Sequence, residues 1–526
     1  MILVQLNQEN FEYDIHSLVK AFYPSEDVTV STGQKEGLDL EPVLRILVEY
    51  GPDTIHIALE GSCGQYPPGH LQSGMDQYPS GHLQSGMDQY PSGHLQSGPG
   101  QQRFEKVFAA DEADRKNTKN LLKQNLYEML SAYTGRTLPW GTLTGIRPSK
   151  IPMTMLEEGR TPAEITDYMQ KTYSASGEKI ALSIEIAQRE ARLLHRLDVE
   201  NGYSLYIGIP FCPSTCLYCS FTSFPISRWK KQIHTYLHAL EQELDFTAQQ
   251  FAGRYLNTIY IGGGTPTTLE PQQMEWLLSA LEHKLDLSRL MEFTVEAGRP
   301  DSITRQKLEV LRAHGISRIS INPQTMKQKT LDLIGRQHTV EQTADSFHLA
   351  RSMGFDNINM DLIMGLPEES LEDVINTLEQ IRELAPDSVT VHSLALKRAA
   401  RLQMFKEDYA GLKMVNTQEH LDAASDACAK MGMVPYYMYR QKNMAGNFEN
   451  VGYAKEGKAG IYNVLMMEEV QSIVACGAGS ISKRVYPDGH IERCENVKDI
   501  SQYISRIGEM LERKRALFQK KDWKRC

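Results

Sequence analysis

From Tyr203 to about residue 400 the sequence alternates short apolar strands with amphipathic helices, and this alternation limits the possible fold more than any other feature. Strands alternating with helices of this length are typical of parallel β/α units. The expected strands are residues 203–209, 256–262, 292–298, 317–322, 357–363 and 388–394, and the expected helices lie near residues 229–251, 271–284, 302–314, 339–353 and 370–384. Six such units predict an α/β fold with an incomplete β/α barrel, in which chemistry takes place at the carboxyl ends of the strands.

Three cysteines follow the first expected strand with the spacing C-x3-C-x2-C: Cys212, Cys216 and Cys219. Thiolate is a standard ligand of iron, so three thiolates can hold three corners of a cubane iron–sulfur cluster and leave the fourth iron open to a small molecule. A structural zinc site is a weaker alternative because it needs four ligands. The remaining alternative is a loop with three free thiols that bind no metal. The other five cysteines are scattered, which does not predict a disulfide framework.

Polar or glycine residues also stand where the next strands end. They are Gly262 to Thr265 at the end of the second strand, Glu296 near the end of the third, Gln324 near the end of the fourth and Asp361 near the end of the fifth. Each has a structural explanation when taken alone, since glycines make tight turns and an aspartate can cap a helix. Together with the cysteine loop, they predict a cavity for a polar ligand.

The first 175 residues are expected to form an N-terminal α/β domain. Its predicted elements are a strand at 2–6, helices near 11–22 and 41–50, a strand at 54–59, and a helix at 116–134 that ends at Gly135. The segment 138–150 is dense in glycine and proline, and a packed connector between domains is favoured there over a lid or an anion-binding element.

A 12-residue unit repeats three times in residues 64–99. It is rich in Gly, Pro, Ser and Gln, so it offers too little apolar surface to offset its ordering entropy. Strand-like segments flank it, which predicts a disordered insert in a hairpin loop. His70, His82 and His94 recur within it, and a metal site there is less favoured than a disordered tract.

Composition limits the class of protein. The length predicts more than one domain: 1–175, a barrel at 176–400, and a C-terminal α+β cap at 401–526. A net charge of −10 argues against a general nucleic-acid binder, and no stretch approaches the roughly 18 apolar residues of a membrane span. Scattered cysteines and the lack of a membrane span lead us to expect a reducing cytoplasm as the compartment. We also expect a monomer.

Several of these stretches resemble one known family. The sequence is similar to the radical S-adenosylmethionine (SAM) enzymes of the oxygen-independent coproporphyrinogen III oxidase, or dehydrogenase, group in YIGIPFCPSTCLYC, GGGTPT, RISINPQTM, GRQHT and NMDLIMGLP. It resembles the HemZ-type branch of that group in LPWGTLTGIRPSK, PYYMYRQKNMAGNFENVGYA and ACGAGSISK.

The resemblance implies a [4Fe-4S] cluster on Cys212, Cys216 and Cys219, with SAM chelating the open iron. It also implies an unidentified electron donor and acceptor, and a 5′-deoxyadenosyl radical that takes a hydrogen from a propionate of coproporphyrinogen III. Loss of CO2 and one electron would leave a vinyl group, and a second round would give protoporphyrinogen IX. The cofactor-binding residues implied by position are Tyr206, Gly263, Gly264, Thr265, Glu296, Gln324, Arg336, Asp361 and Ile363, with Tyr206 and Glu296 as the catalytic candidates.

The sequence departs from the best-known members at two positions. Gly208 replaces a histidine of many relatives, and Phe221 replaces a fourth cysteine. The same aromatic occurs in relatives that resemble haem chaperones, so a haem-binding protein without decarboxylase activity is an alternative. A radical methyltransferase or haem-degrading relative is a second one. A tetra-anionic macrocycle would need cations, for which Arg440, Lys442, Arg147 and Lys150 are candidates, whereas the basic tail is expected to be a solvated helix face.

Overall fold

The computed structural model describes residues 1–24, 26–33, 42–62, 96–98, 101–111, 113–395, 397–405, 407–409, 411–441 and 448–519. His70, His82, His94, Lys442 and nearly all of the 12-residue repeat therefore lie outside the described residues. The chain forms two compact units. One comprises Met1–Ile146, Arg160–Ala181 and Gln441–Phe448, and the other comprises Arg147–Gly159, Leu182–Arg440 and Glu449–Cys526.

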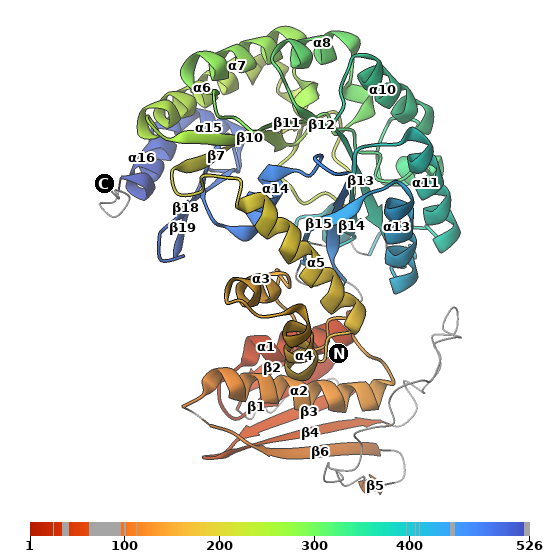
Figure 1. Ribbon diagram of the computed structural model, residues 1–526. Helices are drawn as coiled ribbons and strands as arrows, with labels where there is room; N and C mark the ends of the chain where they lie inside the picture. The colour runs from red at the N-terminus through yellow and green to blue at the C-terminus, as the bar shows by residue number, and fades with distance from the viewer. Residues whose placement is uncertain are drawn as a thin grey trace. The chain divides into compact units, whose positions relative to one another are not determined.

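The first unit is built on a six-stranded sheet of order β2-β1-β3-β4-β6-β5 (Figure 1). The bounds are β1 Ile2–Leu6, β2 Val28–Thr32, β3 Leu44–Tyr50, β4 Thr54–Ser62, β5 Gln96–Gly98 and β6 Gln101–Ala109. Helices α1, Glu12–Phe22, and α2, Arg115–Thr134, share its apolar core with β1, β3 and β4. Gly135 ends α2 in the left-handed conformation, with φ of 66°, as predicted.

The predicted helix near 41–50 is wrong, because this segment is strand β3. Leu44, Ile46, Val48 and Tyr50 are buried while the residues between them are more exposed, which is the two-residue period of a strand. The expected hairpin is present: β4 and β6 are antiparallel neighbours on either side of the repeat. The backbone at 96–98 forms strand β5, so these last repeat residues are not a disordered tract.

The segment 138–150 is tightly packed. Trp140 is fully buried, and the Thr142 amide donates to the Tyr173 carbonyl oxygen at 2.7 Å. A β-carbon on Gly141, whose φ is 52°, would lie 2.0 Å from that same carbonyl oxygen, so only glycine fits there. The boundary between the two units falls at Ile146–Arg147, in agreement with a packed connector. Further helices are α3 Lys150–Glu157, α4 Pro162–Tyr173 and α5 Gly177–Leu194.

The second unit contains an eleven-stranded sheet of order β15-β16-β14-β13-β12-β11-β10-β7-β17-β18-β19. Its parallel run from β7 to β14 confirms the six predicted strands, with ends that differ by a few residues. The bounds are β7 Gly202–Ile209, β10 Tyr255–Gly263, β11 Glu292–Glu296, β12 Arg318–Ser320, β13 Ile358–Met364 and β14 Ser388–Ser393. The sheet curves, and the helices between these strands lie on its outer face: α6 Ile233–Gln250, α7 Pro271–Lys284, α8 Arg305–Ala313, α10 Val340–Ser352 and α11 Leu371–Leu384 (Figure 1).

The residues predicted as a C-terminal cap extend the same sheet at both ends. Strands β15, Val434–Tyr439, and β16, Asn450–Ala454, join beside β14, while β17, Ser472–Cys476, pairs in parallel with β7. Strands β18, Ile481–Val485, and β19, Ile491–Glu495, follow. Helix α14, Ile461–Glu468, lies inside the curve of the sheet (Figure 1), and α13, Gln418–Lys430, lies outside it beside α11. Among the described strands no pairing joins the two ends of the sheet, so a closed barrel is not observed.

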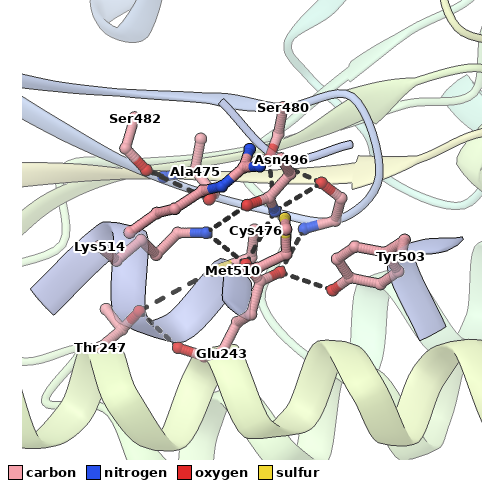
Figure 2. A network of polar contacts seen from close by, with 12 residues as sticks. Glu243, Thr247, Ala475, Cys476, Ser480, Ser482, Asn496, Tyr503, Met510 and Lys514 are labelled. Carbon is pink, nitrogen blue, oxygen red and sulfur yellow. Dashed lines mark hydrogen bonds and ion pairs between the residues drawn. The ribbon is translucent and has the colours of Figure 1, made fainter. Parts of the chain in front are cut away.

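A buried polar network fastens the last helices to α6 (Figure 2). Glu243 of α6 is fully buried and forms an ion pair with Lys514 of α16, Ile507–Phe518. Its carboxylate also accepts hydrogen bonds from Tyr503 Oη at 2.5 Å, in α15, Ile500–Ser505, from the Gly477 amide at 2.6 Å, and from Asn496 Nδ2 at 2.8 Å. A buried carboxylate with four partners has its charge compensated, so the network holds the turn after β17 in one place.

Candidate active site

The cysteine loop leaves β7 at the carboxyl edge of the parallel strands. Cys216 is buried, and Cys212 and Cys219 are half-buried. Hydrogen bonds to the backbone of residues 334–335 hold the loop in place. The Leu217 amide donates to the Ile334 carbonyl oxygen at 3.0 Å, and Ser214 Oγ donates to the Gly335 carbonyl oxygen at 3.0 Å. The three sulfurs are therefore presented by a fastened loop beside a strand end.

Arg299 is a residue of this site that the sequence analysis missed. Its Nη1 lies 3.8 Å from Cys216 Sγ and donates to Ser214 Oγ at 3.0 Å, while Asp301 holds its other nitrogens at 2.9 and 2.6 Å. A guanidinium so placed stabilises negative charge on the sulfurs. Arg299 belongs to no motif used above, but its position three residues beyond Glu296 was a usable signal.

Burial raises the pKa of the Cys212 thiol to about 11, so iron has to displace its proton on binding. In the described part of the chain no three His, Cys, Asp or Glu side chains converge on the position of a single metal ion. A cubane cluster does not require such convergence, because each cysteine binds a different iron atom. The donor set of three thiols beside a cation fits a [4Fe-4S] cluster.

The glycine run lets β10 approach the cysteine strand closely. The Gly264 and Thr265 amides donate to the carbonyl oxygens of Ile209 and Phe211, at 2.8 and 2.7 Å. A β-carbon on Gly264 would lie 2.5 Å from the Phe211 carbonyl oxygen. These two predicted cofactor-binding amides are thus occupied by the chain itself. Gly263, with φ of 106°, faces Tyr206 Oη, which a β-carbon there would approach to 3.3 Å.

Tyr206 and Glu296 come together through residues that were not predicted. Tyr206 stacks on Tyr260 of β10 and on Tyr462 of α14, with ring centroids 6.2 and 6.3 Å apart. Tyr260 Oη donates to Glu296 Oε1 at 2.5 Å. Burial raises the pKa of Glu296 to about 7, and the hydrogen bond from Tyr260 limits that rise. Tyr260 was detectable as the strand neighbour of Tyr206, whereas Tyr462 reaches the site only through the folding of α14.

Gln324 and Asp361 lie side by side at the next strand ends. The Gln324 amide donates to the Asp361 carbonyl oxygen at 3.0 Å, and Gln324 has φ of 70°. Its Oε1 is buried and has no hydrogen-bond partner among the described residues. A buried acceptor of this kind needs a donor, which a bound ligand can supply.

The Asp361 carboxylate accepts a hydrogen bond from Asn359 Nδ2 at 2.7 Å, and its Oδ2 lies 3.9 Å from His392 Nε2. Burial raises the pKa of Asp361, but His392, Asn359 and Arg318 together bring it below the ordinary value. His392 was also missed, although it stands near the end of β14, where Tyr439 Oη lies 3.2 Å from its Nδ1.

Arg336 and Ile363 occupy packed positions. Arg336 Nη2 donates to the carbonyl oxygens of Gly298 and Asn322, at 2.9 and 2.6 Å, and Nη1 donates to Tyr218 Oη at 3.1 Å. Its terminal nitrogens thus brace the cysteine loop against two strand ends, leaving a buried Nε without a partner among the described residues. Ile363 packs in an apolar cluster with Leu331, Ile334 and Leu366, against which Tyr218 and Leu394 also pack.

The two departures from the family have different surroundings. Gly208 is packed: its carbonyl oxygen accepts from Tyr236 Oη at 2.6 Å, and a β-carbon on Gly477 would lie 2.4 Å from that oxygen. Phe221 is instead 72% exposed. Of the cations considered for a macrocycle, Arg440 is 5% exposed, and Arg147 pairs with Glu469 at 3.1 Å. Lys150 is exposed.

Comparison with known proteins defines the class and then the family. Residues 206–381 match the family model of the radical SAM superfamily. The chain is 40% identical over 423 residues to the oxygen-independent coproporphyrinogen-III oxidase-like protein HemZ of Bacillus subtilis, covering 77% of this chain and 83% of that protein. The protein therefore belongs to the oxygen-independent coproporphyrinogen-III oxidase-like family of radical SAM proteins, and it uses a [4Fe-4S] cluster and SAM.

Two further matches are more partial. The heme chaperone HemW of Bacillus subtilis is 38% identical over 195 residues, covering 37% of this chain and 51% of that protein. The match to the solved structure of coproporphyrinogen III oxidase (HemN) from Escherichia coli covers 64% of this chain and 74% of the HemN chain, at 25% sequence identity and a TM-score of 0.48. No described helix is both long and apolar enough to cross a membrane.

Proposed function

We propose that this protein decarboxylates coproporphyrinogen III without oxygen, turning two propionate side chains into vinyl groups and giving protoporphyrinogen IX. The observation that carries the proposal is the similarity to the HemZ oxidase-like protein, because it extends over 83% of that protein's length. The oxygen-independent coproporphyrinogen III oxidase of Salmonella typhimurium has a weaker and shorter match, 27% identical over 314 residues.

Within this proposal, Cys212, Cys216 and Cys219 hold the cluster. Bound cluster and SAM supply one-electron chemistry, which removes a hydrogen atom from the substrate when an electron donor reduces the site. The chain's own residues bind and orient: Glu296 and Asp361 offer carboxylates to the ammonium and hydroxyl groups of SAM, and Gln324 Oε1 offers a free acceptor. Tyr206 packs against the stacked pair of Tyr260 and Tyr462, and Tyr260 links it to Glu296.

Arg299 has a positioning role in this proposal. Its guanidinium contacts Cys216 Sγ and Ser214 in the cysteine loop, and Asp301 fixes its orientation.

The loss of CO2 also leaves one electron that an acceptor must take. That acceptor is a separate partner.

The test is an anaerobic assay of the reconstituted, reduced protein with SAM and coproporphyrinogen III, followed by identification of the tetrapyrrole and measurement of CO2. Protoporphyrinogen IX is the expected product. A Cys216→Ala variant serves as the control, and we expect it to lose both cluster absorbance and SAM cleavage. Cleavage of SAM by the native protein without release of CO2 would contradict the proposal.

A haem chaperone is the second candidate, because the HemW relative is 38% identical over 195 residues. It predicts stable haem binding and no vinyl product. The same assay separates the two, since only the oxidase changes the side chains of the added tetrapyrrole.

A further inference from the structure

A basic and apolar surface lies beside the cysteine loop. We name it the mouth rim, and it consists of Phe221, Lys397, Arg398, Arg401, Met404 and Phe405. Phe221 follows the last cysteine by two residues, and the other five belong to the segment after β14, which includes the short helix α12, Arg401–Met404.

The mouth rim bridges two distant strands. β7 and β14 are the first and last members of the parallel run, yet the loops that follow them meet. The Leu402 amide donates to the Leu217 carbonyl oxygen at 3.1 Å, and Tyr218 and Leu394 pack against the same apolar cluster as Ile363. The rim therefore lies at the carboxyl edge where Cys219 and Asp361 also lie, which is the reactive edge of such folds.

The apolar members of the rim are unusually exposed. Phe221 is 72% exposed, Met404 61% and Phe405 47%. Clustered exposed apolar side chains of this size mark binding surfaces more often than single ones do. Lys397 Nζ lies 5.8 Å from the centroid of the Phe221 ring, so one cation and one aromatic face already share the surface.

The three cations of the rim lack carboxylate partners among the described residues. Lys397, Arg398 and Arg401 are exposed, and none of them forms an ion pair there. The sequence contains no acidic residue between Asp387 and Glu407, although the chain as a whole carries −10. A local excess of unpaired positive charge in an acidic protein favours a ligand with several negative charges.

We propose that the mouth rim binds the tetrapyrrole, with its three cations pairing with propionate carboxylates and Phe221 packing on the macrocycle. This inference rests on the proposed function and names residues that recognise its substrate. Three exposed cations without ion pairs in the described residues match the carboxylates of a tetrapyrrole, and the exposed Phe221 ring matches its flat macrocycle.

The experiment is a fluorescence titration with coproporphyrin III, the stable oxidised form that retains four carboxylates. It compares the native protein with Lys397→Ala/Arg398→Ala/Arg401→Ala and with a control, Arg196→Ala/Arg305→Ala/Lys430→Ala, which removes three exposed cations elsewhere. We expect the rim variant to bind about tenfold more weakly at low salt, with the difference shrinking as salt screens the charges. The control should bind like the native protein.

A second variant, Phe221→Ser, tests the apolar part of the proposal and should weaken binding at low and at high salt. Equal affinities of the native and rim-variant proteins would overturn the proposal. So would a rim variant that binds coproporphyrin normally but loses turnover with a flavodoxin and keeps it with dithionite, because the surface would then dock an electron carrier.

The binding and turnover measurements distinguish a failure of the rim proposal from a failure of the oxidase proposal. If the native protein binds coproporphyrin but yields no vinyl product, the oxidase proposal fails, while weaker binding by the rim variant still supports the rim. If turnover and affinity are both native-like in the rim variant, the rim proposal alone fails.

Discussion

Glu296 is a half-buried residue at a strand end, and its carboxylate accepts a hydrogen bond from one tyrosine. Tyr260 donates to it at 2.5 Å, and burial raises its pKa to about 7. The carboxylate is therefore mostly neutral below about pH 6 and mostly ionised above about pH 8. Because only the ionised form offers a full negative charge to an ammonium or hydroxyl donor, ligand binding at this residue depends on pH.

We predict that SAM binds the reconstituted protein more tightly as the pH rises through about 7. Glu296→Gln should weaken binding about tenfold above that pH and remove this pH dependence. Tyr260→Phe should move the transition to higher pH, because the hydrogen bond from Tyr260 lowers the pKa of Glu296 and its removal lets that pKa rise. Calorimetric titration across this pH range measures both effects. A native affinity that does not change with pH would refute the assignment.

At the scale of elements, helices α6, α15 and α16 are joined to the turn after β17 by buried polar contacts. Tyr236 of α6 links this turn to the cysteine strand, because its Oη accepts a hydrogen bond from the Ala478 amide at 3.1 Å and donates to the Gly208 carbonyl oxygen at 2.6 Å. The C-terminal helices thus stabilise the strand that carries the cysteines, although they lie about 300 residues further along the chain.

Removing one charge of this network should be costly. Lys514→Met leaves Glu243 buried without its ion-pair partner, and we expect the free energy of unfolding to fall by about 3–5 kcal/mol. Glu243→Gln/Lys514→Met removes both charges and should recover part of that loss. Arg513→Ala, which breaks an exposed pair with Glu509 and an exposed hydrogen bond to the Glu495 carbonyl oxygen, should cost about 1 kcal/mol. Urea unfolding of the three variants measures the differences, and a Lys514→Met protein as stable as Arg513→Ala would contradict the role of the network.

At the scale of the whole molecule, the 12-residue repeat interrupts a hairpin that is complete without it. Strands β4 and β6 pair along their length, from Thr54 with Ala109 to Ser62 with Gln101. Residues of the two strands make all of these pairings, and none involves the segment that connects the strands. Loop length changes the closure entropy only slowly, so the unit tolerates a long insertion.

We predict that replacing residues 63–95 with a short glycine-rich turn leaves the protein folded. The melting temperature should stay the same or rise, since a shorter loop stabilises the hairpin by about 2 kcal/mol or less. SAM cleavage, measured as 5′-deoxyadenosine, should be unchanged. Circular dichroism and product analysis provide the measurements, and loss of the folded state would show that the repeat contributes to the core.

The sequence alone determined the parallel strands, their helices and the residues at the strand ends, because periodic apolar burial and strand termini are local properties of the chain. It misassigned 41–50, where Leu44, Ile46, Val48 and Tyr50 alternate, since a short apolar run can be read with either period. Only the tertiary structure brought Tyr462 onto Tyr206, Arg299 to Cys216, and the segment after β14 to the cysteine loop. These contacts join residues from about 80 to 260 positions apart, and no local pattern encodes which distant side chains a folded sheet will bring together.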